Sequence, residues 1–382
     1  MKTIKVQLDF NITKRIHSLY HSFFNNPPEG VEYVKSEFRG INEKNYSYLG
    51  KIYKKTVKIF PFVSRFHQNI IDILRKEKGI DLIHFTFHLG ETKKPCVVDY
   101  ENVYNFIKVN ETEDKRLKNK AINRINKKNI KYLMPIHNEA LKSFKLLFGN
   151  SVNKPQEIVY PTIFIPEEFR KNIKKENKII FISTSNITDY DDVFLIKGGY
   201  ETILAFEQLS KKYSNWEFLV LGKIPKYLER KFPKNLIFKE GVPREEMWNI
   251  FNKSKIFVQP CYQAPAMSFI EAMWLKLPII TYDCWANNEY VNKDNGILIQ
   301  PEKIDYINKY NIPEYSKETF DKIRENSKKN SKKIKRAIEK LIKNDKLREK
   351  LGNNGFKEVL EDKFSIDKKN EKLRKIYKEA LS

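Results

Sequence analysis

The sequence predicts an α/β protein with two domains, each built on a parallel sheet that is covered by helices. A chain of 382 residues is long enough for two separate cores. In its second half, short apolar runs rich in β-branched and aromatic residues recur at a steady spacing, and segments of helical period separate several of them. This alternation is typical of parallel sheets with helices on both faces, and their ligands bind beyond the carboxyl ends of the strands.

The expected elements follow from these runs. In the second half, we expect strands at 178–183, 216–222, 235–239, 255–259, 278–282 and 296–300, and helices at 199–213, 244–252 and 268–276. In the first half, we expect strands at 4–10, 81–87, 96–100 and 132–136, and helices at 63–78 and 138–148. The stretch 29–53 has few clear signals, which favours an irregular segment that is mobile or binds a partner.

Prolines and a charged run between 160 and 177 mark a linker. We therefore expect a first domain over 1–165, a second over 166–362, and a separate C-terminal helix over 363–382, with apolar positions such as Leu373 and Ile376.

Composition limits the function. No apolar run approaches the ~18 residues of a membrane span, and the N-terminus has no signal-peptide pattern, so we expect a cytoplasmic protein. Three scattered cysteines, Cys96, Cys261 and Cys284, fit reduced and buried thiols. The net charge of +24 fits a solvated, lysine-rich helical surface; peripheral attraction to an anionic membrane or a lipid-linked acceptor is the alternative. Nucleic acid is not favoured, because no recognised motif accompanies the charge.

The stretch 258–291, VQPCYQAPAMSFIEAMWLKLPIITYDCWANNEYV, is the most informative part of the chain. It reads as a strand, a loop, a helix that starts at Ser268, and a second strand after Leu277-Pro278. Ser268 and Glu271 fit a capping box, which leaves the positive end of the helix facing the loop. Such an end suits a phosphate, and a carboxylate beside it suits ribose hydroxyls. The pattern favours a nucleotide-sugar site over a bare phosphate site.

Four segments, in this order, resemble the retaining GT-B glycosyltransferases of the family 4 class, also called glycosyltransferase group 1. They are Leu195-Ile196-Lys197-Gly198-Gly199 with the helix after it; Phe218–Gly222; the stretch from Gly241-Val242-Pro243-Arg244 through 268–273 to Asn295–Ile299; and 341–357 with Phe364-Ser365 and Ile376-Tyr377. The first half matches weakly, at 81–84 and 156–164.

The resemblance implies a GT-B fold: two Rossmann-like domains facing a cleft, with the last helix crossing back to the first domain. It also implies transfer of a sugar from a nucleoside diphosphate sugar to an acceptor, with retention of configuration. The acceptor, a glycan, a lipid-linked glycan or a protein, would be held by the first domain. The donor is a substrate, and neither a cofactor nor a metal is expected.

The resemblance also assigns donor-site roles. Lys197 matches the lysine that grips the diphosphate, and Glu271 matches the glutamate that holds the ribose. Ala266, Met267 and Ser268 lie at the helix start that receives the phosphates. Each role has a structural alternative: Glu271 as a helix cap only, and Lys197 as a turn lysine.

This chain departs from the family pattern at several donor-site positions. Gln263 stands where the family has a second glutamate, so it can hydrogen-bond the donor sugar but carries no charge; an ordinary loop polar residue is the alternative. Ala264-Pro265-Ala266 replaces a glycine pair, and the proline removes one N–H donor. The loop 183–191 offers no arginine beside Lys197.

On the acceptor side, the family's histidine is missing from the strand that ends at Asp99-Tyr100-Glu101. Asp99 or Glu101 is expected to act as the base or as an anchor for the acceptor hydroxyl, with structural helix caps as the alternative. His88 is a further catalytic candidate at a strand's carboxyl end, whereas His84 fits a core histidine.

Rival functions remain open. The departures favour, as an alternative, a degenerate, non-catalytic GT-B protein that binds a sugar nucleotide or scaffolds a partner. Another GT-B activity, such as a phosphorylase or an inverting transferase, is a second rival. The acidic run Asp189-Tyr190-Asp191-Asp192 is read as a hydrophilic loop and not as a metal site.

Overall fold

The computed structural model describes residues 3–9, 18–37, 75–170, 173–183 and 190–382. The chain divides into two compact units. Unit 1 comprises Met1–Phe164, Lys309–Asn311 and Ile366–Ser382, and unit 2 comprises Ile165–Asn308 and Ile312–Ser365. The last helix of the sequence thus belongs to the first unit.

Unit 1 is built on a five-stranded parallel sheet with the strand order β2-β1-β3-β4-β5. The three inner strands have buried side chains along most or all of their length, because helices or loops cover both faces. The four strands that the apolar runs predict are all present. The strands are β1 (Ile4–Asp9), β2 (Val31–Lys35), β3 (Leu82–Thr86), β4 (Cys96–Tyr100) and β5 (Ile130–Pro135).

Strand β2 corrects the expectation of an irregular segment at 29–53. It pairs with β1 at the edge of the sheet, with Ile4 opposite Val31. Only Val31 is fully buried, and Glu32 and Lys35 are exposed. An edge strand with such mixed polarity produces no continuous apolar run, so the sequence pattern did not reveal it. Residues 38–53 lie outside the described part of the chain.

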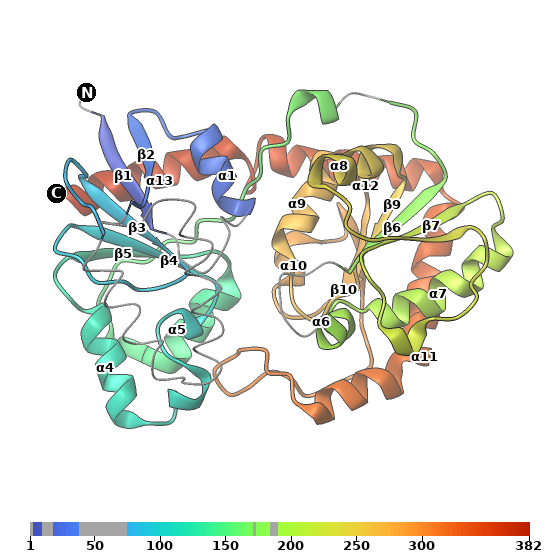
Figure 1. The fold of residues 1–382 in the computed structure, drawn as a ribbon, viewed down its shortest axis with the longest axis horizontal. Coiled ribbons are helices and arrows are strands. Elements are labelled where there is room, and N and C mark those ends of the chain that lie inside the picture. The colour runs from blue at the N-terminus through green and yellow to red at the C-terminus, as the bar shows by residue number, and fades with distance from the viewer. Residues whose placement is uncertain (1–2, 10–17, 38–74, 171–172, 184–189) are drawn as a thin grey trace. The chain divides into compact units, whose positions relative to one another are not determined.

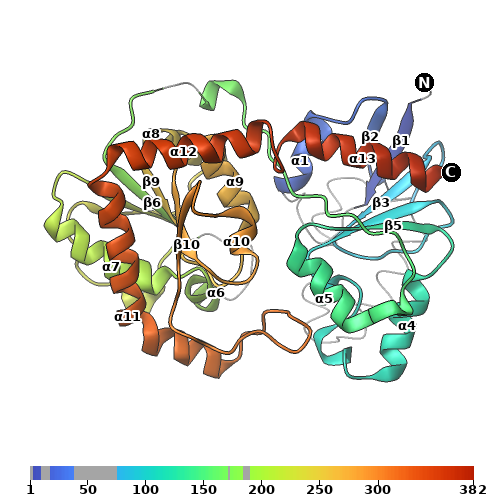
Figure 2. The same ribbon diagram turned by 180° about the vertical axis from the view of Figure 1, so that it is seen from behind.

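Four α-helices of unit 1 are described. Figure 2 shows α13 lying across the strands, and it contacts β3, β4 and β5. Of the predicted helix at 63–78, residues 63–74 lie outside the described part, and 75–78 are not helical. The helices are α1 (Ser18–Asn25), α4 (Lys115–Ile125), α5 (Asn138–Phe148) and α13 (Ile366–Leu381), and short 3-10 turns occupy Val103–Asn105, Val109–Glu111 and Gly149–Ser151.

Buried polar contacts fix α13 to this sheet. The Tyr377 hydroxyl lies 2.9 Å from His84 Nδ1 and 3.0 Å from the Tyr33 hydroxyl. Lys369 Nζ donates to Ser22 Oγ at 2.9 Å. His84 is buried and both of its ring nitrogens have partners, which confirms its reading as a core histidine.

Unit 2 is built on a six-stranded parallel sheet with the order β11-β10-β9-β6-β7-β8. All six predicted strands are present, because most lie between two helical layers and read as continuous apolar runs. The strands are β6 (Lys178–Ile182), β7 (Glu217–Leu221), β8 (Leu236–Lys239), β9 (Ile256–Val258), β10 (Ile279–Tyr282) and β11 (Gly296–Ile299).

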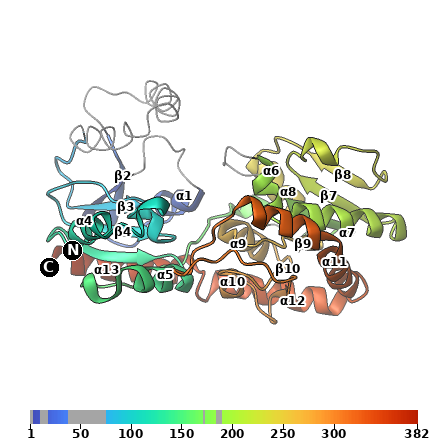
Figure 3. The ribbon, with the colours of Figure 1, turned by 90° about the horizontal axis from the view of Figure 1, so that it is seen from below.

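Helices cover both faces of this second sheet. Figure 1 shows α7 and α11 on one side of it, and α12 lies against α9 on the other (Figures 1 and 3). The helices are α6 (Tyr190–Ile196), α7 (Gly199–Lys212), α8 (Arg244–Lys253), α9 (Ala266–Trp274), α10 (Asn287–Tyr290), α11 (Lys317–Ile342) and α12 (Asp345–Leu360), with 3-10 turns at Glu167–Phe169 and Lys226–Leu228.

Among the described helices, none combines the length and the apolar character that a bilayer crossing requires. Cys96 and Cys261 are buried as expected, whereas Cys284 is only half-buried.

One lysine closes the ends of two helices in unit 2. Lys175 Nζ donates to the carbonyl oxygens of Asn252 (3.3 Å), Ser254 (2.9 Å) and Leu275 (2.9 Å). These carbonyls lie at the C-terminal ends of α8 and α9, where no further backbone N–H is in position to bond them.

Replacing Lys175 by methionine should therefore lower the free energy of unfolding by about 2–4 kcal/mol, since it leaves three carbonyls without their donor. All four tryptophans of the chain, at 216, 248, 274 and 285, lie in unit 2, so urea unfolding followed by tryptophan fluorescence reports on this unit. The exposed neighbour Lys174 provides the control. Equal losses in Lys175→Met and Lys174→Met would contradict the capping role.

Candidate functional site

Two loops meet at the carboxyl edge of the unit 2 sheet. One is the turn at Lys197 and Gly198 between α6 and α7; the other, residues 259–265, joins β9 to α9. The Tyr262 amide donates to the Ile196 carbonyl at 2.8 Å, and Gln259 Nε2 donates to the Lys197 carbonyl at 3.4 Å. The strands before these loops, β6 and β9, are neighbours in the sheet. The fold thus brings the loops that carry Lys197 and Gln263 together.

Gly198 allows this close approach. It precedes α7 with φ of +70°, and a Cβ atom at this position would lie 2.1 Å from the Pro260 carbonyl oxygen. A residue with a side chain would meet both a strained backbone and a steric clash. The glycine is therefore what lets the two loops touch.

Helix α9 begins at Ala266 with Pro265 as its N-cap. The predicted start at Ser268 and the capping box between Ser268 and Glu271 are wrong. Ser268 is already inside the first turn, and its amide donates to the Pro265 carbonyl at 2.9 Å. Proline presets a turn of this kind, so the helix starts directly after it. The amides of Ala266 and Met267 have no hydrogen-bond partner among the described residues.

Glu271 lies buried one turn and a half into α9 and contacts α8. Its Oε1 accepts hydrogen bonds from Arg244 Nη2 at 2.7 Å and from Trp248 Nε1 at 3.1 Å. The Arg244 guanidinium also stacks on the Trp248 ring, 5.2 Å from its centre. Arg244 was not among the predicted site residues. The sequence feature that could have indicated Arg244 is its position as the first residue of α8, shortly after the end of β8.

Lys197 and Gln263 are each half-buried. Burial lowers the pKa of Lys197 to about 8. An anion placed beside the ammonium group would restore the charged form. Most of the loop in which the family carries its arginine, residues 184–189, lies outside the described part of the chain.

The predicted acceptor-side residues lie at the carboxyl edge of the unit 1 sheet. Asp99, at the end of β4, is buried; it accepts from the Tyr20 hydroxyl at 2.8 Å and from the Phe87 amide at 2.7 Å, and His84 Nε2 lies 3.2 Å away. These contacts commit the Asp99 carboxylate to the protein. Glu101, two residues on, is half-buried.

His88 lies in a second polar cluster at this edge. Its Nδ1 is 3.0 Å from the Thr86 carbonyl oxygen, and its Nε2 is 3.6 Å from Asp9 Oδ2. Asp9 also pairs with the buried guanidinium of Arg75. Burial alone would raise the pKa of Asp9, but His88 and Arg75 hold it below its ordinary value. The His88 ring is thus oriented by groups of unit 1.

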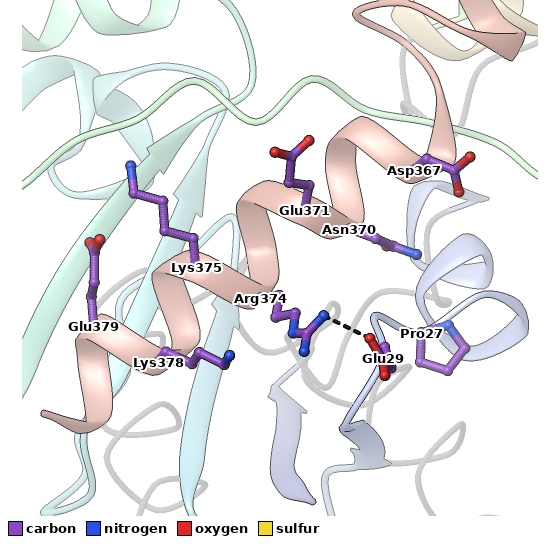
Figure 4. Close-up of a pocket in the computed structure, with 9 residues that line it drawn as sticks. All are labelled: Pro27, Glu29, Asp367, Asn370, Glu371, Arg374, Lys375, Lys378 and Glu379. Atoms are coloured by element: carbon purple, nitrogen blue, oxygen red, sulfur yellow. Dashed lines mark hydrogen bonds and ion pairs between the residues drawn. The ribbon is translucent and has the colours of Figure 1, made fainter. Parts of the chain in front are cut away.

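A hollow of about 730 Å³ in unit 1 lies elsewhere, between α13 and the loop before β2 (Figure 4). Arg374 and Glu29 form an ion pair of 2.7 Å across it. Its other charged side chains are of both signs, and none of the predicted site residues lines it. This hollow does not belong to the candidate site.

Within the described residues, no group of three or more His, Cys, Asp or Glu side chains is placed to hold a metal ion. Asp189 lies outside the described part, as do the side chains of Tyr190 and Asp191; Asp192 is half-buried in α6. Metal independence stays a prediction.

Comparisons with known proteins bear on this site. Residues 164–329 match the family model of the glycosyl transferases group 1. Among solved structures, sucrose-phosphate synthase from Thermosynechococcus elongatus is 11% identical with a TM-score of 0.57, each chain being covered to 98%. A search of curated proteins found no match.

Two further structures are similar over nearly the whole chain. HepE of Anabaena, solved with UDP and glucose, is 12% identical with a TM-score of 0.56, covering 98% of this chain and 99% of that one. WaaG, a glycosyltransferase involved in lipopolysaccharide biosynthesis, is 15% identical with a TM-score of 0.53 and the same coverage. The predicted GT-B fold with two Rossmann-like domains is confirmed. The match of residues 164–329 to a glycosyltransferase family model agrees with the predicted class.

Replacing Gly198 by alanine should destabilise unit 2 for two reasons: the backbone conformation is strained for alanine, and the new Cβ atom clashes with Pro260. Gly241 is a matched control, because it has φ of +64° but no atom within 4 Å of a Cβ. We expect Gly241→Ala to cost about 1–2 kcal/mol and Gly198→Ala about 1–3 kcal/mol more. Urea unfolding monitored by tryptophan fluorescence measures both variants. Equal losses would show that the two loops do not need their close contact.

Proposed function

We propose that this protein transfers a sugar from a nucleoside diphosphate sugar to an acceptor hydroxyl, with retention of configuration and without a metal ion. One observation carries the proposal: the Lys197 turn, the Gln263 loop and the free amides of α9 lie together at one edge of the unit 2 sheet. A cation and a positive helix end are what a diphosphate leaving group requires.

The donor diphosphate would lie between Lys197 and the start of α9. The ammonium group of Lys197 and the amides of Ala266 and Met267 would take up the negative charge that grows on the phosphate as it leaves. Ser268 follows them in the same turn. Pro265 has no N–H to offer, so this site has fewer backbone donors than a glycine loop provides.

Glu271 would hold the ribose. Its two protein donors, Arg244 and Trp248, meet the same oxygen, Oε1, which leaves Oε2 to accept from ribose hydroxyls. Arg244 balances the charge of this buried carboxylate and fixes its orientation. Arg244 also places a positive charge beside the nucleoside. This charge partly compensates for the arginine that the loop near Lys197 lacks.

In the reaction, the bond between C1 of the sugar and the phosphate oxygen breaks, and the acceptor oxygen bonds to C1. The acceptor proton passes to the departing phosphate, so a strong protein base is not required. Gln263 would hydrogen-bond the donor sugar without adding charge. On unit 1, Asp99 is committed to its own neighbours, so Glu101 and His88 are the groups that we assign to the acceptor.

A glycan, a lipid-linked glycan or a protein remains the proposed acceptor class. The exposed basic side chains of α4, Lys115, Arg116 and Lys120, support peripheral contact with an anionic lipid surface. The uncharged Gln263 supports the rival function, a non-catalytic protein that binds a sugar nucleotide.

A thermal-shift screen against UDP-, GDP-, ADP- and dTDP-sugars, each with and without a chelator, tests the proposal. One nucleotide family should raise the melting temperature, because a ligand that binds only the folded protein stabilises it. The shift should survive the chelator and should be lost in Lys197→Ala and Glu271→Ala. The absence of any shift for all four donors would refute the donor site. Binding without turnover in the presence of glycan acceptors would favour the non-catalytic rival.

The pH dependence of binding provides a second test. Because the pKa of Lys197 is about 8, its ammonium group is lost as the pH rises further. We expect the affinity for a nucleoside diphosphate to fall roughly tenfold from pH 8 to pH 9.5 in the wild type. Lys197→Arg should keep its affinity over this range, since arginine stays charged. Isothermal titration measures both, and an equal fall in the two proteins would exclude Lys197 as the phosphate ligand.

A further inference from the structure

Unit 2 buries one carboxyl group that the reaction does not use. Glu201 is the third residue of α7, and it has no exposed surface. Its Oε1 accepts a hydrogen bond from the Tyr262 hydroxyl at 2.9 Å, and Asn330 Nδ2 of α11 donates to that hydroxyl at 3.3 Å. The Tyr282 hydroxyl of β10 lies close enough to interact with the same carboxyl group.

Within the described part of the chain, no lysine, arginine or histidine forms an ion pair with Glu201. The groups that face it are Tyr262 from the β9–α9 loop, Tyr282 from β10, Cys284 just after β10, and Asn330 from α11.

Neither the tyrosines nor the cysteine supplies a charge, because burial raises the pKa of all three groups, that of Cys284 to about 12. An ionised carboxylate without a cation is unfavourable in such surroundings, and a protonated one is not. Burial accordingly raises the pKa of Glu201 to about 7.

The partner of Glu201 lies next to the donor site. Tyr262 directly precedes Gln263 in the sequence. Its amide donates to the Ile196 carbonyl at 2.8 Å, beside Lys197, and its carbonyl oxygen accepts from the Tyr306 hydroxyl at 2.9 Å. The Tyr262 side chain thus runs from the loop that carries Gln263 into the core, where Glu201 meets its end.

We propose that Glu201 is a positioning residue: as a neutral carboxylic acid it holds Tyr262, and through Tyr262 it holds the Gln263 loop against the Lys197 turn. This role rests on the proposed function, because the two loops are those assigned to the donor. Glu201 touches neither donor nor acceptor. Loss of its proton leaves a charge without a cation in the core. The Tyr262 hydroxyl donates more strongly to a carboxylate, but burial of the charge costs more than this bond returns and favours opening of the packed arrangement, so donor binding is tightest below neutral pH.

The direction of the effect on stability follows from the raised pKa. Between the ordinary pKa of 4.5 and about 7, the folded protein binds more protons at Glu201 than the unfolded chain does. The stabilising contribution is complete below pH 4.5 and is lost as the pH rises through about 7.

The experiment compares the wild type with Glu201→Gln and Tyr262→Phe. Glutamine has the shape of the neutral acid and cannot ionise, while the phenylalanine removes the hydroxyl that Glu201 holds. Glu207→Gln, a half-buried carboxylate on the same helix that pairs with Arg230, is the matched control. Melting temperatures without ligand are recorded from pH 5 to pH 8.5, and the dissociation constants of UDP, GDP, ADP and dTDP are measured over the same range.

Without ligand, the melting temperature of Glu201→Gln relative to the wild type should rise with pH, whereas that of Glu207→Gln should not. With whichever of the four nucleotides binds, the ratio of the wild-type dissociation constant to that of Glu201→Gln should grow roughly tenfold from pH 6 to pH 8.5. This ratio cancels the titration of Lys197, which both proteins share. Tyr262→Phe should bind more weakly at pH 6 and lose most of the pH dependence that Glu201 contributes.

If the melting temperatures of Glu201→Gln and the wild type differ by the same amount at every pH, that result would contradict the inference that Glu201 is a neutral acid in the folded protein. A constant ratio of dissociation constants, with the expected melting temperatures, would overturn the positioning role and leave Glu201 as a structural acid. If the wild type binds none of the four nucleotides at any pH, the proposed function fails and the positioning role fails with it, while the melting temperatures still decide the protonation of Glu201.

Discussion

The contact between Gly198 and the Pro260 carbonyl is the constraint on which the candidate site depends. Pro260 follows β9, and Gly198 lies in the turn after α6, which comes after the neighbouring strand β6. The missing side chain of Gly198 lets the two loops approach to a distance that no other residue permits. The amide of Tyr262 then bonds the carbonyl of Ile196, and the entry of α7 is fixed against the loop that leads into α9. The positions of Lys197 and Gln263 both follow from this single close approach.

Around this contact the protein pairs its buried carboxyl groups in different ways. Glu271 forms an ion pair with Arg244, whereas Glu201 faces uncharged groups, with the Tyr262 hydroxyl as its donor, and burial favours the neutral acid. In unit 1, Asp99 accepts from a tyrosine and a backbone amide. A neighbouring cation favours the ionised form of a buried carboxyl group, whereas burial without one favours the neutral acid. The surroundings of the two carboxyl groups of unit 2, and not their residue type, are therefore the basis on which we assign Glu271 to the ribose and Glu201 to positioning.

At the start of α9, the local sequence pattern predicts a helix start that differs from the one in the structure. The pattern Ser268-x-x-Glu271 satisfies the capping rule, yet Pro265 begins the helix two residues earlier. Glu271 is then free of the cap and turns to α8, where Arg244 and Trp248 hold it. The proposed phosphate site at this helix end does not depend on the cap, because it uses the backbone amides of Ala266 and Met267, which have no hydrogen-bond partner among the described residues.

The sequence by itself determined the two-unit α/β architecture, because buried parallel strands leave continuous apolar runs and glycine and proline mark the turns. It also indicated Lys197, Gln263 and Glu271, because their motifs are local. It did not indicate the edge strand β2, whose mixed polarity lacks a pattern, nor the roles of Arg244 and Glu201. Their partners lie 27 and 61 residues away in the chain. Only the packing of α8 on α9, and of α7 under the β9–α9 loop, decided which carboxyl group is paired with a cation and which is buried alone.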